Sequence, residues 1–178
     1  MSTTQEVAAA LQRVEDVFRR RPETGLHDDA PATARWTGGL GVDACHANGI
    51  KVPTDMPGEF GGHGNHVTPG WLFRAGLATC ATSCIAMAAA AEGIELTLLE
   101  VRATSRTDGR GMLGMLEANG ARVNSSPRDV QLHVRIAAKG ESEERLRAVV
   151  DKGVSQSPVP SAARQALPLA IDVVVDAA

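Results

Sequence analysis

Three cysteines, Cys45, Cys80 and Cys84, give this chain its clearest capacity for nucleophilic and redox chemistry. Cys80 and Cys84 are four residues apart, so in a helix they share one face. That spacing disfavours a disulfide between them, because their β-carbons lie about 5 to 6 Å apart, whereas a disulfide requires about 3.5 to 4.5 Å. Two interpretations remain: a reactive thiol, or two small buried side chains, which is the commoner role of free cysteine.

A second group of potential ligands lies in and near a glycine-rich segment. His63 and His66 are separated by two residues, and Cys45 and His46 lie upstream. Imidazole and thiolate groups bind zinc or copper. The spacing is not diagnostic, since no second close pair follows and neighbouring residues of a strand point to opposite sides. A metal site is therefore kept only as an alternative, and we expect no metal or other cofactor.

Composition and motifs exclude several other classes of protein. The 178 residues carry 18 Lys and Arg against 21 Asp and Glu, and only 3% of them are aromatic. This balance argues against a nucleic acid partner, which needs basic charge and stacking side chains. No phosphate-binding glycine loop with its Lys-Ser/Thr pair occurs, so ATP and nicotinamide cofactors are not expected. With 43% hydrophobic residues the chain can form one ordinary domain.

The N-terminus predicts an amphipathic helix that precedes this domain. Ser2 and Gln5 form a capping-box pattern, and apolar residues then recur at helical spacing until a basic cluster and Pro22 end the helix. We therefore divide the chain into residues 1–22, the N-terminal helix, and 23–178, a single domain. The segment lacks the cationic start of a signal peptide, and an odd cysteine count fits a reducing compartment, so a cytoplasmic location is expected.

Residues 70 to 92 are expected to form a long central helix. Thr68 is a good N-cap, Pro69 suits the first helical position, and Gly93 is a C-terminal stop. Apolar residues occur on all sides of this helix, so we predict that it is buried on every side and does not span a membrane. Gly76 in its interior costs about 1 kcal/mol relative to Ala, which predicts a closely crossing neighbour there.

The remaining elements predict an α+β fold with antiparallel sheets packed against helices. Alternating apolar and polar residues indicate sheet strands, and a serine N-cap before an apolar periodic segment indicates a further helix. Expected strands are Thr33–Trp36, Ile50–Val52, Leu96–Thr107, Val130–Ala137 and a final strand Ala170–Val175, with a helix after Ser142 and a turn or short helix over Pro160–Leu167. Gly38-Gly39 and Asn48-Gly49 are turn signals, the second being a dipeptide that tight hairpins prefer.

A series of short motifs resembles the OsmC/Ohr superfamily, the osmotically inducible and organic hydroperoxide resistance proteins. The resemblance covers roughly Pro31 to the C-terminus, and it is moderately specific because the motifs share the order and spacing of that family. The motifs are Ala34-Arg35-Trp36-x-Gly38-Gly39-Leu40, Asp55-x-Pro57, Gly61-Gly62, Thr68-Pro69, Leu72-Phe73-x-Ala75-Gly76-Leu77-Ala78-Thr79-Cys80, Asp108-x-Arg110-Gly111-Met112-Leu113-Gly114 and Ser157-Pro158-Val159.

This resemblance implies an intertwined homodimer with its active sites at the subunit boundary, and a peroxidase of the peroxiredoxin type. Cys80 matches the peroxidatic cysteine, which attacks an organic hydroperoxide and becomes a sulfenic acid. A free thiol, with a pKa of about 8.5, is mostly protonated at neutral pH, so a cation must assist it. We assign that role to Arg35, and a substrate pocket to Trp71, Phe73 and Leu77.

The chain also departs from the pattern of this family. Family members with established peroxidase chemistry have a second cysteine before proline, where this chain has Ser157, and a glutamate where it has Gly70 and Trp71. A cycle with one cysteine then requires an external thiol as reductant, with Cys84 as a possible secondary thiol. The alternative is a catalytically degenerate protein that binds a small apolar ligand at the dimer interface.

Overall fold

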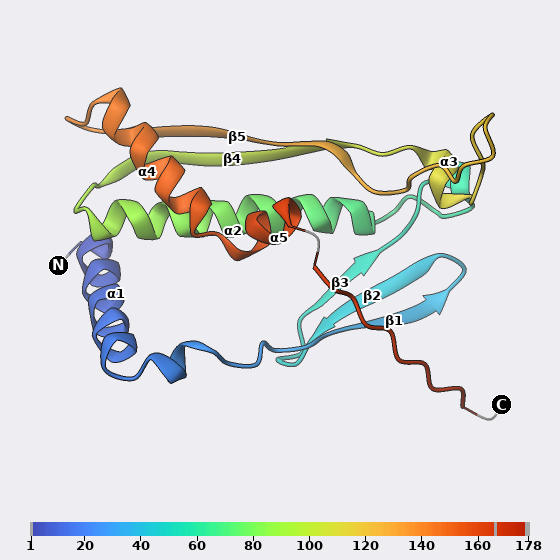
Figure 1. Cartoon of the computed structure of the whole chain (residues 1–178), viewed down its shortest axis with the longest axis horizontal. Coiled ribbons are helices and arrows are strands. Elements are labelled where there is room, and N and C mark those ends of the chain that lie inside the picture. Colours follow the sequence, from blue (N-terminus) through green and yellow to red (C-terminus); the bar gives the residue numbers. More distant parts are fainter. Residues whose placement is uncertain (1, 166, 177–178) are drawn as a thin grey trace.

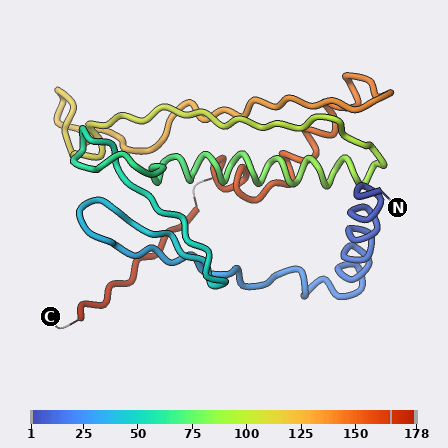
Figure 2. The backbone as a smooth tube through the Cα atoms, turned by 180° about the vertical axis from the view of Figure 1, so that it is seen from behind, coloured from blue at the N-terminus to red at the C-terminus, as the bar shows by residue number. Residues whose placement is uncertain are grey.

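The computed structural model describes residues 2–165 and 167–176 and has the predicted α+β architecture. Two antiparallel sheets lie on opposite sides of one long helix, α2, as Figures 1 and 2 show. In chain order the elements are α1 (Thr3–Arg20), η1 (Pro22–Gly25), β1 (Ala32–Gly38), β2 (Gly41–His46), β3 (Lys51–Thr54), η2 (Gly58–Phe60), α2 (Pro69–Ala91), β4 (Leu96–Arg106), α3 (Gly109–Met112), β5 (Arg128–Ala138), α4 (Glu143–Ser155) and α5 (Pro158–Arg164).

Side-chain caps fix where the three longer helices begin, as the sequence predicted. Ser2 and Gln5 form a full capping box at the start of α1. The hydroxyl of Thr68 accepts a hydrogen bond from the Trp71 backbone N–H, and that of Ser142 accepts one from the N–H of Arg145. Each cap satisfies a backbone donor that has no partner within its helix. Local sequence therefore sets the starts of α1, α2 and α4.

The core lies where α2, α4 and the β4–β5 sheet meet. Its buried side chains come from the C-terminal half of α2, the turn that follows it and the inner face of α4: Ile85, Ala88, Ala89, Ile94, Leu146 and Val149. Half-buried aliphatic residues of β4 and β5 pack against this cluster. The apolar face of α4 thus holds the C-terminal half of α2 against the sheet.

Two helices cross closely at Gly153 and not at Gly76, where the sequence predicted a close crossing. A β-carbon added at Gly153 would lie 2.5 Å from the Cα of Ile85, so α4 and α2 approach closely there. At Gly76 the nearest atom would be Cγ1 of Val159 at 3.9 Å, an ordinary contact. The prediction at Gly76 was wrong within this chain, because a helical glycine does not reveal which neighbour crosses it.

The central helix is also not buried on every side, contrary to the prediction. α1, β4, α4 and α5 pack against it, yet Trp71, Phe73 and Met87 remain exposed. By length and composition α2 could cross a membrane, but its contacts with four other elements are those of a core helix. In the part of the chain that the structure describes, one side of this apolar helix is therefore left partly uncovered.

The predicted strands are present except at the C-terminus, and β2 is a further strand for which the sequence analysis gave no range. β1, β2 and β3 form one antiparallel sheet in chain order, and β4 pairs with β5 to form the other. The prediction of a final strand over Ala170–Val175 was wrong for the isolated chain: these residues form no strand and are exposed. Alternation gives a segment strand propensity, but a strand also needs a partner edge, and the segment meets none in the described chain.

Candidate active site

Cys80 lies in the middle of α2, between two contacts with the junction of α4 and α5. Gly76, Cys80 and Cys84 follow one another at intervals of four residues and share one helix face. One turn before Cys80, Gly76 faces Val159 of α5. One turn after it, the Cys84 thiol lies 3.9 Å from the carbonyl oxygen of Gln156. These contacts direct this face of α2 toward the segment that connects α4 with α5.

Ser157 lies in that connecting segment. Its side chain is fully buried, and its hydroxyl donates a hydrogen bond of 2.8 Å to the carbonyl oxygen of Gly153. The hydroxyl is therefore engaged with the backbone of α4. A thiol at this position would lie opposite the Cys80 region of α2, but a serine cannot form a disulfide.

All three cysteines are free and half-buried. Cys45 belongs to β2, in the sheet on the other side of α2 from β4 and β5 (Figure 1), and its thiol lies 3.7 Å from the carbonyl oxygen of Asp43. Cys80 and Cys84 are therefore the two thiols that share a helix and a local environment.

The structure does not bring Arg35 to Cys80 within one chain. Arg35 is exposed on β1, where it is paired in register with Asp43 of β2. Figures 1 and 2 show this sheet set apart from α2, on the side away from β4 and β5. Arg74, the nearer arginine in sequence, lies at the start of α2 and donates a 3.4 Å hydrogen bond to the hydroxyl of Ser105. The prediction that Arg35 lies beside Cys80 is therefore not met within one chain.

The three predicted pocket residues have different surroundings. Leu77 is buried and lines a cavity of about 360 Å³ between α2, β5, α4 and α5. Trp71 and Phe73 are exposed at the N-terminal end of α2 and do not line it. Leu77 thus contributes to the fold of this chain, whereas the two aromatic side chains are free to meet a ligand or a partner.

Asp55 organises the loop that leads into α2, a role that the sequence analysis missed. Its buried carboxylate accepts hydrogen bonds from the backbone N–H groups of Met56, His63 and Gly64, at 2.7, 2.8 and 3.0 Å. Burial raises the pKa of this carboxyl, but the hydrogen bonds together outweigh burial and hold its pKa below the usual value. An Asp-x-Pro motif followed by Gly-Gly was the available signal for this turn.

The same loop forms one wall of a small polar cavity. His63 and His66 line it together with Asp43 and Asp55, and its volume is about 350 Å³. Among residues 2–165 and 167–176, no group of three or more His, Cys, Asp or Glu side chains is arranged to hold a metal ion. His46, the other histidine of the metal hypothesis, accepts a hydrogen bond at Nδ1 from the N–H of Asn48.

The Asp-x-Arg motif after β4 is a structural ion pair. Arg110 donates to Asp108 at 2.6 Å and to Glu117 at 3.2 Å. The hydrogen bond from the Arg110 side chain holds the pKa of Asp108 below its usual value, and the same contact raises the pKa of Arg110. Because the guanidinium is bound by two carboxylates of its own loop, Arg110 shapes this loop and is not free to activate a thiol.

Comparisons with known proteins agree with this architecture. A sequence profile described as OsmC-like protein matches residues 62–172. An organic hydroperoxide resistance protein OsmC from Legionella pneumophila is 22% identical, with a TM-score of 0.57 over 78% of this chain and 91% of its own. An OsmC-like protein from Mycoplasma pneumoniae is 17% identical, with a TM-score of 0.65 over 79% and 91%.

A third solved structure, the organic hydroperoxide resistance protein OhrB of Bacillus subtilis, is 20% identical and gives a TM-score of 0.51 over 78% of this chain and 93% of its own. No curated protein matches the sequence. At these identities the structural likeness establishes the fold, and the profile match covers more than half of the chain.

Proposed function

The chain belongs to the OsmC-like protein family, and on that premise we propose that it is a thiol-dependent peroxidase that reduces organic hydroperoxides with Cys80 as its reactive thiol. The observation that carries this proposal is the place of Cys80: half-buried, in the middle of the central helix, on the face directed at the Ser157 segment. Similar folds occur in proteins named for organic hydroperoxide resistance.

The proposed reaction begins with attack by the Cys80 thiolate on the terminal oxygen of the hydroperoxide. The O–O bond breaks, the departing alkoxide takes a proton to become an alcohol, and Cys80 becomes a sulfenic acid. The sulfur thereby loses two electrons and the peroxide gains them. An external thiol then attacks the sulfenic sulfur, releasing water and forming a mixed disulfide, and a second thiol of that reductant restores Cys80.

The external thiol is required because Ser157 leaves no second thiol at the α4–α5 junction. Cys84 is one helical turn from Cys80, and its thiol is directed toward the Gln156 carbonyl. A disulfide between the two would require local unwinding of α2. Dependence on reduced thiols favours the cytoplasm as the working compartment, in keeping with three free cysteines.

We propose further that the active unit is a homodimer in which Arg35 of one copy assists Cys80 of the other. Within one chain Arg35 lies on the sheet set apart from α2, whereas α2 has uncovered apolar side chains that a second copy would bury. A guanidinium close to the sulfur stabilises the thiolate and interacts favourably with the peroxide oxygens.

Consumption of an organic hydroperoxide under excess dithiol tests the chemistry. The native protein and its Cys84→Ser variant are expected to consume peroxide, and Cys80→Ser is expected to be inactive. Cys84→Ser is the matched control, because it removes a thiol from the same helix face one turn away. If all three proteins fail to consume peroxide, the peroxidase proposal is wrong and the binding of a small apolar ligand becomes the better account.

Mixing two variants tests whether the site is shared between copies. Arg35→Ala is expected to lower the rate roughly 100-fold, as loss of a preorganised donor does. A mixed dimer of Arg35→Ala with Cys80→Ser contains one site with both residues intact. Activity of the mixture well above that of either variant supports a shared site, and a mixture no more active than the separate variants contradicts it.

A further inference from the structure

The apolar stripe of the N-terminal helix α1 is only partly covered by its own chain. In the N-terminal half of this amphipathic helix, residues 7–11 are half-buried, and this half meets α2 (Figure 1). Val14 and Phe18 continue the same stripe at helical spacing, yet they are 48% and 41% exposed. The C-terminal half of α1 therefore presents an apolar surface that the described chain leaves open.

The helix α1 stands at one end of α2 and extends away from it. Its N-terminal end meets the C-terminal end of α2, and α1 and the β1–β2–β3 sheet both lie on the side of α2 away from β4 and β5 (Figures 1 and 2). Residues 21–31, which join α1 to β1, are exposed throughout. Because helices in proteins are stabilised mainly by packing of their apolar face, a partner for the open half of the stripe would stabilise α1.

A second open apolar surface lies at the opposite end of α2. Trp71 and Phe73, in the first turns of this helix, are 48% and 37% exposed. At about 1.5 Å of rise per residue they lie roughly 30 Å along the helix from its C-terminal end. Since α1 of the same chain meets α2 at that far end and points away from it, α1 does not cover them.

A second copy of the chain brings these two surfaces together. A two-fold axis that crosses α2 at right angles near its middle places the C-terminal end of one helix beside the N-terminal end of the other. Each α1 then stands beside Trp71 and Phe73 of the other copy, and both contacts form at once. A different partner would have to match two separate surfaces, whereas a second copy supplies for each surface the one that it lacks.

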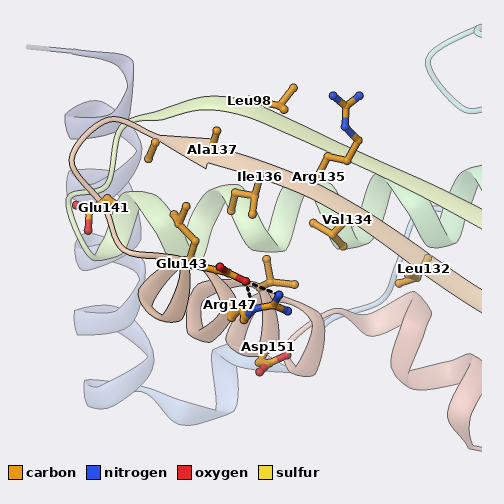
Figure 3. A pocket seen from close by; sticks show the side chains of 13 residues that line it. Leu98, Leu132, Val134, Arg135, Ile136, Ala137, Glu141, Glu143, Arg147 and Asp151 are labelled. Atoms are coloured by element: carbon orange, nitrogen blue, oxygen red, sulfur yellow. Dashed lines mark hydrogen bonds and ion pairs between the residues drawn. The ribbon is translucent and has the colours of Figure 1, made fainter.

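The groove between β5 and α4 is a less suitable site for this stripe. Its volume is about 800 Å³, and Figure 3 shows Glu143 and Arg147 at its edge, where they form an ion pair of 2.6 Å. An aromatic side chain would enter it beside charged groups, whereas the N-terminal end of α2 offers two aromatic rings. The groove also borders β5, which lies on the opposite side of α2 from α1.

We propose that α1 of one copy packs through Val14 and Phe18 against Trp71 and Phe73 of a second copy. This inference rests on the homodimer proposed above but not on the peroxide chemistry. It assigns the two aromatic side chains of α2 to the contact between copies, in place of the substrate pocket that the sequence predicted for them. It also gives a role to a helix that lies outside residues 62–172, the range of the family profile.

Engineered disulfides test whether α1 reaches the second copy. All three native cysteines are first replaced by serine. Two variants are then made in this background, one with Phe18→Cys and Trp71→Cys and the other with Phe18→Cys and Phe73→Cys. After mild oxidation, at least one of them is expected to form a covalent dimer, because the two new thiols lie too far apart in one chain to join.

Matched variants control for random cross-linking. Each of the three cysteine substitutions alone is expected to give no covalent dimer, since the contact joins unlike surfaces. Arg13 is exposed on the polar side of α1, so Arg13→Cys in place of Phe18→Cys is expected not to cross-link either. Absence of a covalent dimer from both Phe18→Cys pairs, or equal cross-linking by the Arg13→Cys pairs, overturns the proposal.

Fluorescence of Trp71 gives a second readout, without engineered thiols. The chain has two tryptophans, so Trp36→Phe leaves Trp71 as the only one. In that background, Phe18→Ala is expected to shift the emission of Trp71 to longer wavelength and to increase its quenching by acrylamide, whereas Arg13→Ala leaves both unchanged. Emission and quenching that do not respond to Phe18→Ala contradict the contact.

Sedimentation separates failure of this contact from failure of the homodimer. Phe18→Ala is expected to weaken dimerisation roughly 10-fold or more, as truncation of an aromatic anchor in an interface does, with the helical circular dichroism signal retained. A native dimer whose dissociation constant is unchanged by Phe18→Ala overturns the proposal and leaves the homodimer intact. A native protein that is monomeric overturns both.

Discussion

Gly153 is the position where one added methyl group should disturb the fold most. A β-carbon there would lie 2.5 Å from Cα and 2.7 Å from N of Ile85, both backbone atoms in the C-terminal half of α2. Since a rotamer change cannot relieve contact with backbone, α4 and α2 must separate. Overpacking costs about 1 to 3 kcal/mol, and contacts this short place Gly153→Ala at the upper end of that range.

In a helix, alanine is also about 1 kcal/mol more favourable than glycine. Subtracting that gain from an overpacking cost of about 3 kcal/mol leaves an expected net loss of folding stability of about 2 kcal/mol for Gly153→Ala. For a chain of this length the melting temperature should fall by roughly 4 to 8 °C. Gly76→Ala is the control, because its added carbon meets only Val159 at 3.9 Å, and it should be as stable as the native protein or slightly more stable. The assay is thermal and urea unfolding at one protein concentration. A Gly153→Ala protein as stable as the native one would refute this account of the crossing.

Three further changes have defined outcomes. Ser142→Ala removes the N-cap of α4 and should cost about 1 kcal/mol in urea unfolding, whereas Ser142→Asp, which keeps an acceptor for the Arg145 N–H, should not. Because the folded-state pKa of Asp55 is depressed, its carboxylate stabilises the fold above the unfolded pKa of about 3.9, and this stability is lost as the pH falls through the folded value. Asp55→Asn should therefore be less stable at neutral pH and show a flatter acid limb in unfolding followed against pH; an unchanged acid limb contradicts the assignment. Ser157→Cys should form a disulfide with Cys80 after one equivalent of hydroperoxide, seen as the loss of two hydrogens by mass; a persistent sulfenic acid in that variant would contradict the facing positions of these residues.

Sequence predicted the local features of this fold well because their causes are local. Helix starts depend on a hydroxyl and a backbone N–H within three residues, as at Ser2, Thr68 and Ser142. The strand pairs β1–β2 and β2–β3 follow from turns at Gly38–Gly39 and Asn48–Gly49, where Gly39 and Gly49 have φ of 54° and 92°.

Features that depend on distant partners could not be predicted in the same way. Gly153 and Ile85 are far apart in sequence, and no pattern in α4 shows that its glycine faces the backbone of α2. Nor could alternation over Ala170–Val175 show that its pairing edge is missing from the isolated chain. In each case the sequence defines one of the two contacting surfaces, and whether the contact forms depends on which element the fold places opposite it.

The candidate site shows the same division. The position of Cys80 along α2 could be predicted, because the sequence defines where this helix begins and ends, and the structure agrees with it. Its relation to Arg35 is set by how β1 and α2 are placed in space, and within one chain they are apart. Asp55 was overlooked because its three hydrogen bonds form only when the loop folds back on itself.

The rate at which Cys80 reacts with a stoichiometric organic hydroperoxide is the most direct test of the central claim. The reaction is followed by rapid mixing and by mass analysis of the three cysteines after trapping of the sulfenic acid. The proposed function predicts one sulfenic acid per chain, located at Cys80 and formed far faster than on free cysteine. Oxidation at free-cysteine rates, or spread equally over Cys45, Cys80 and Cys84, would contradict it.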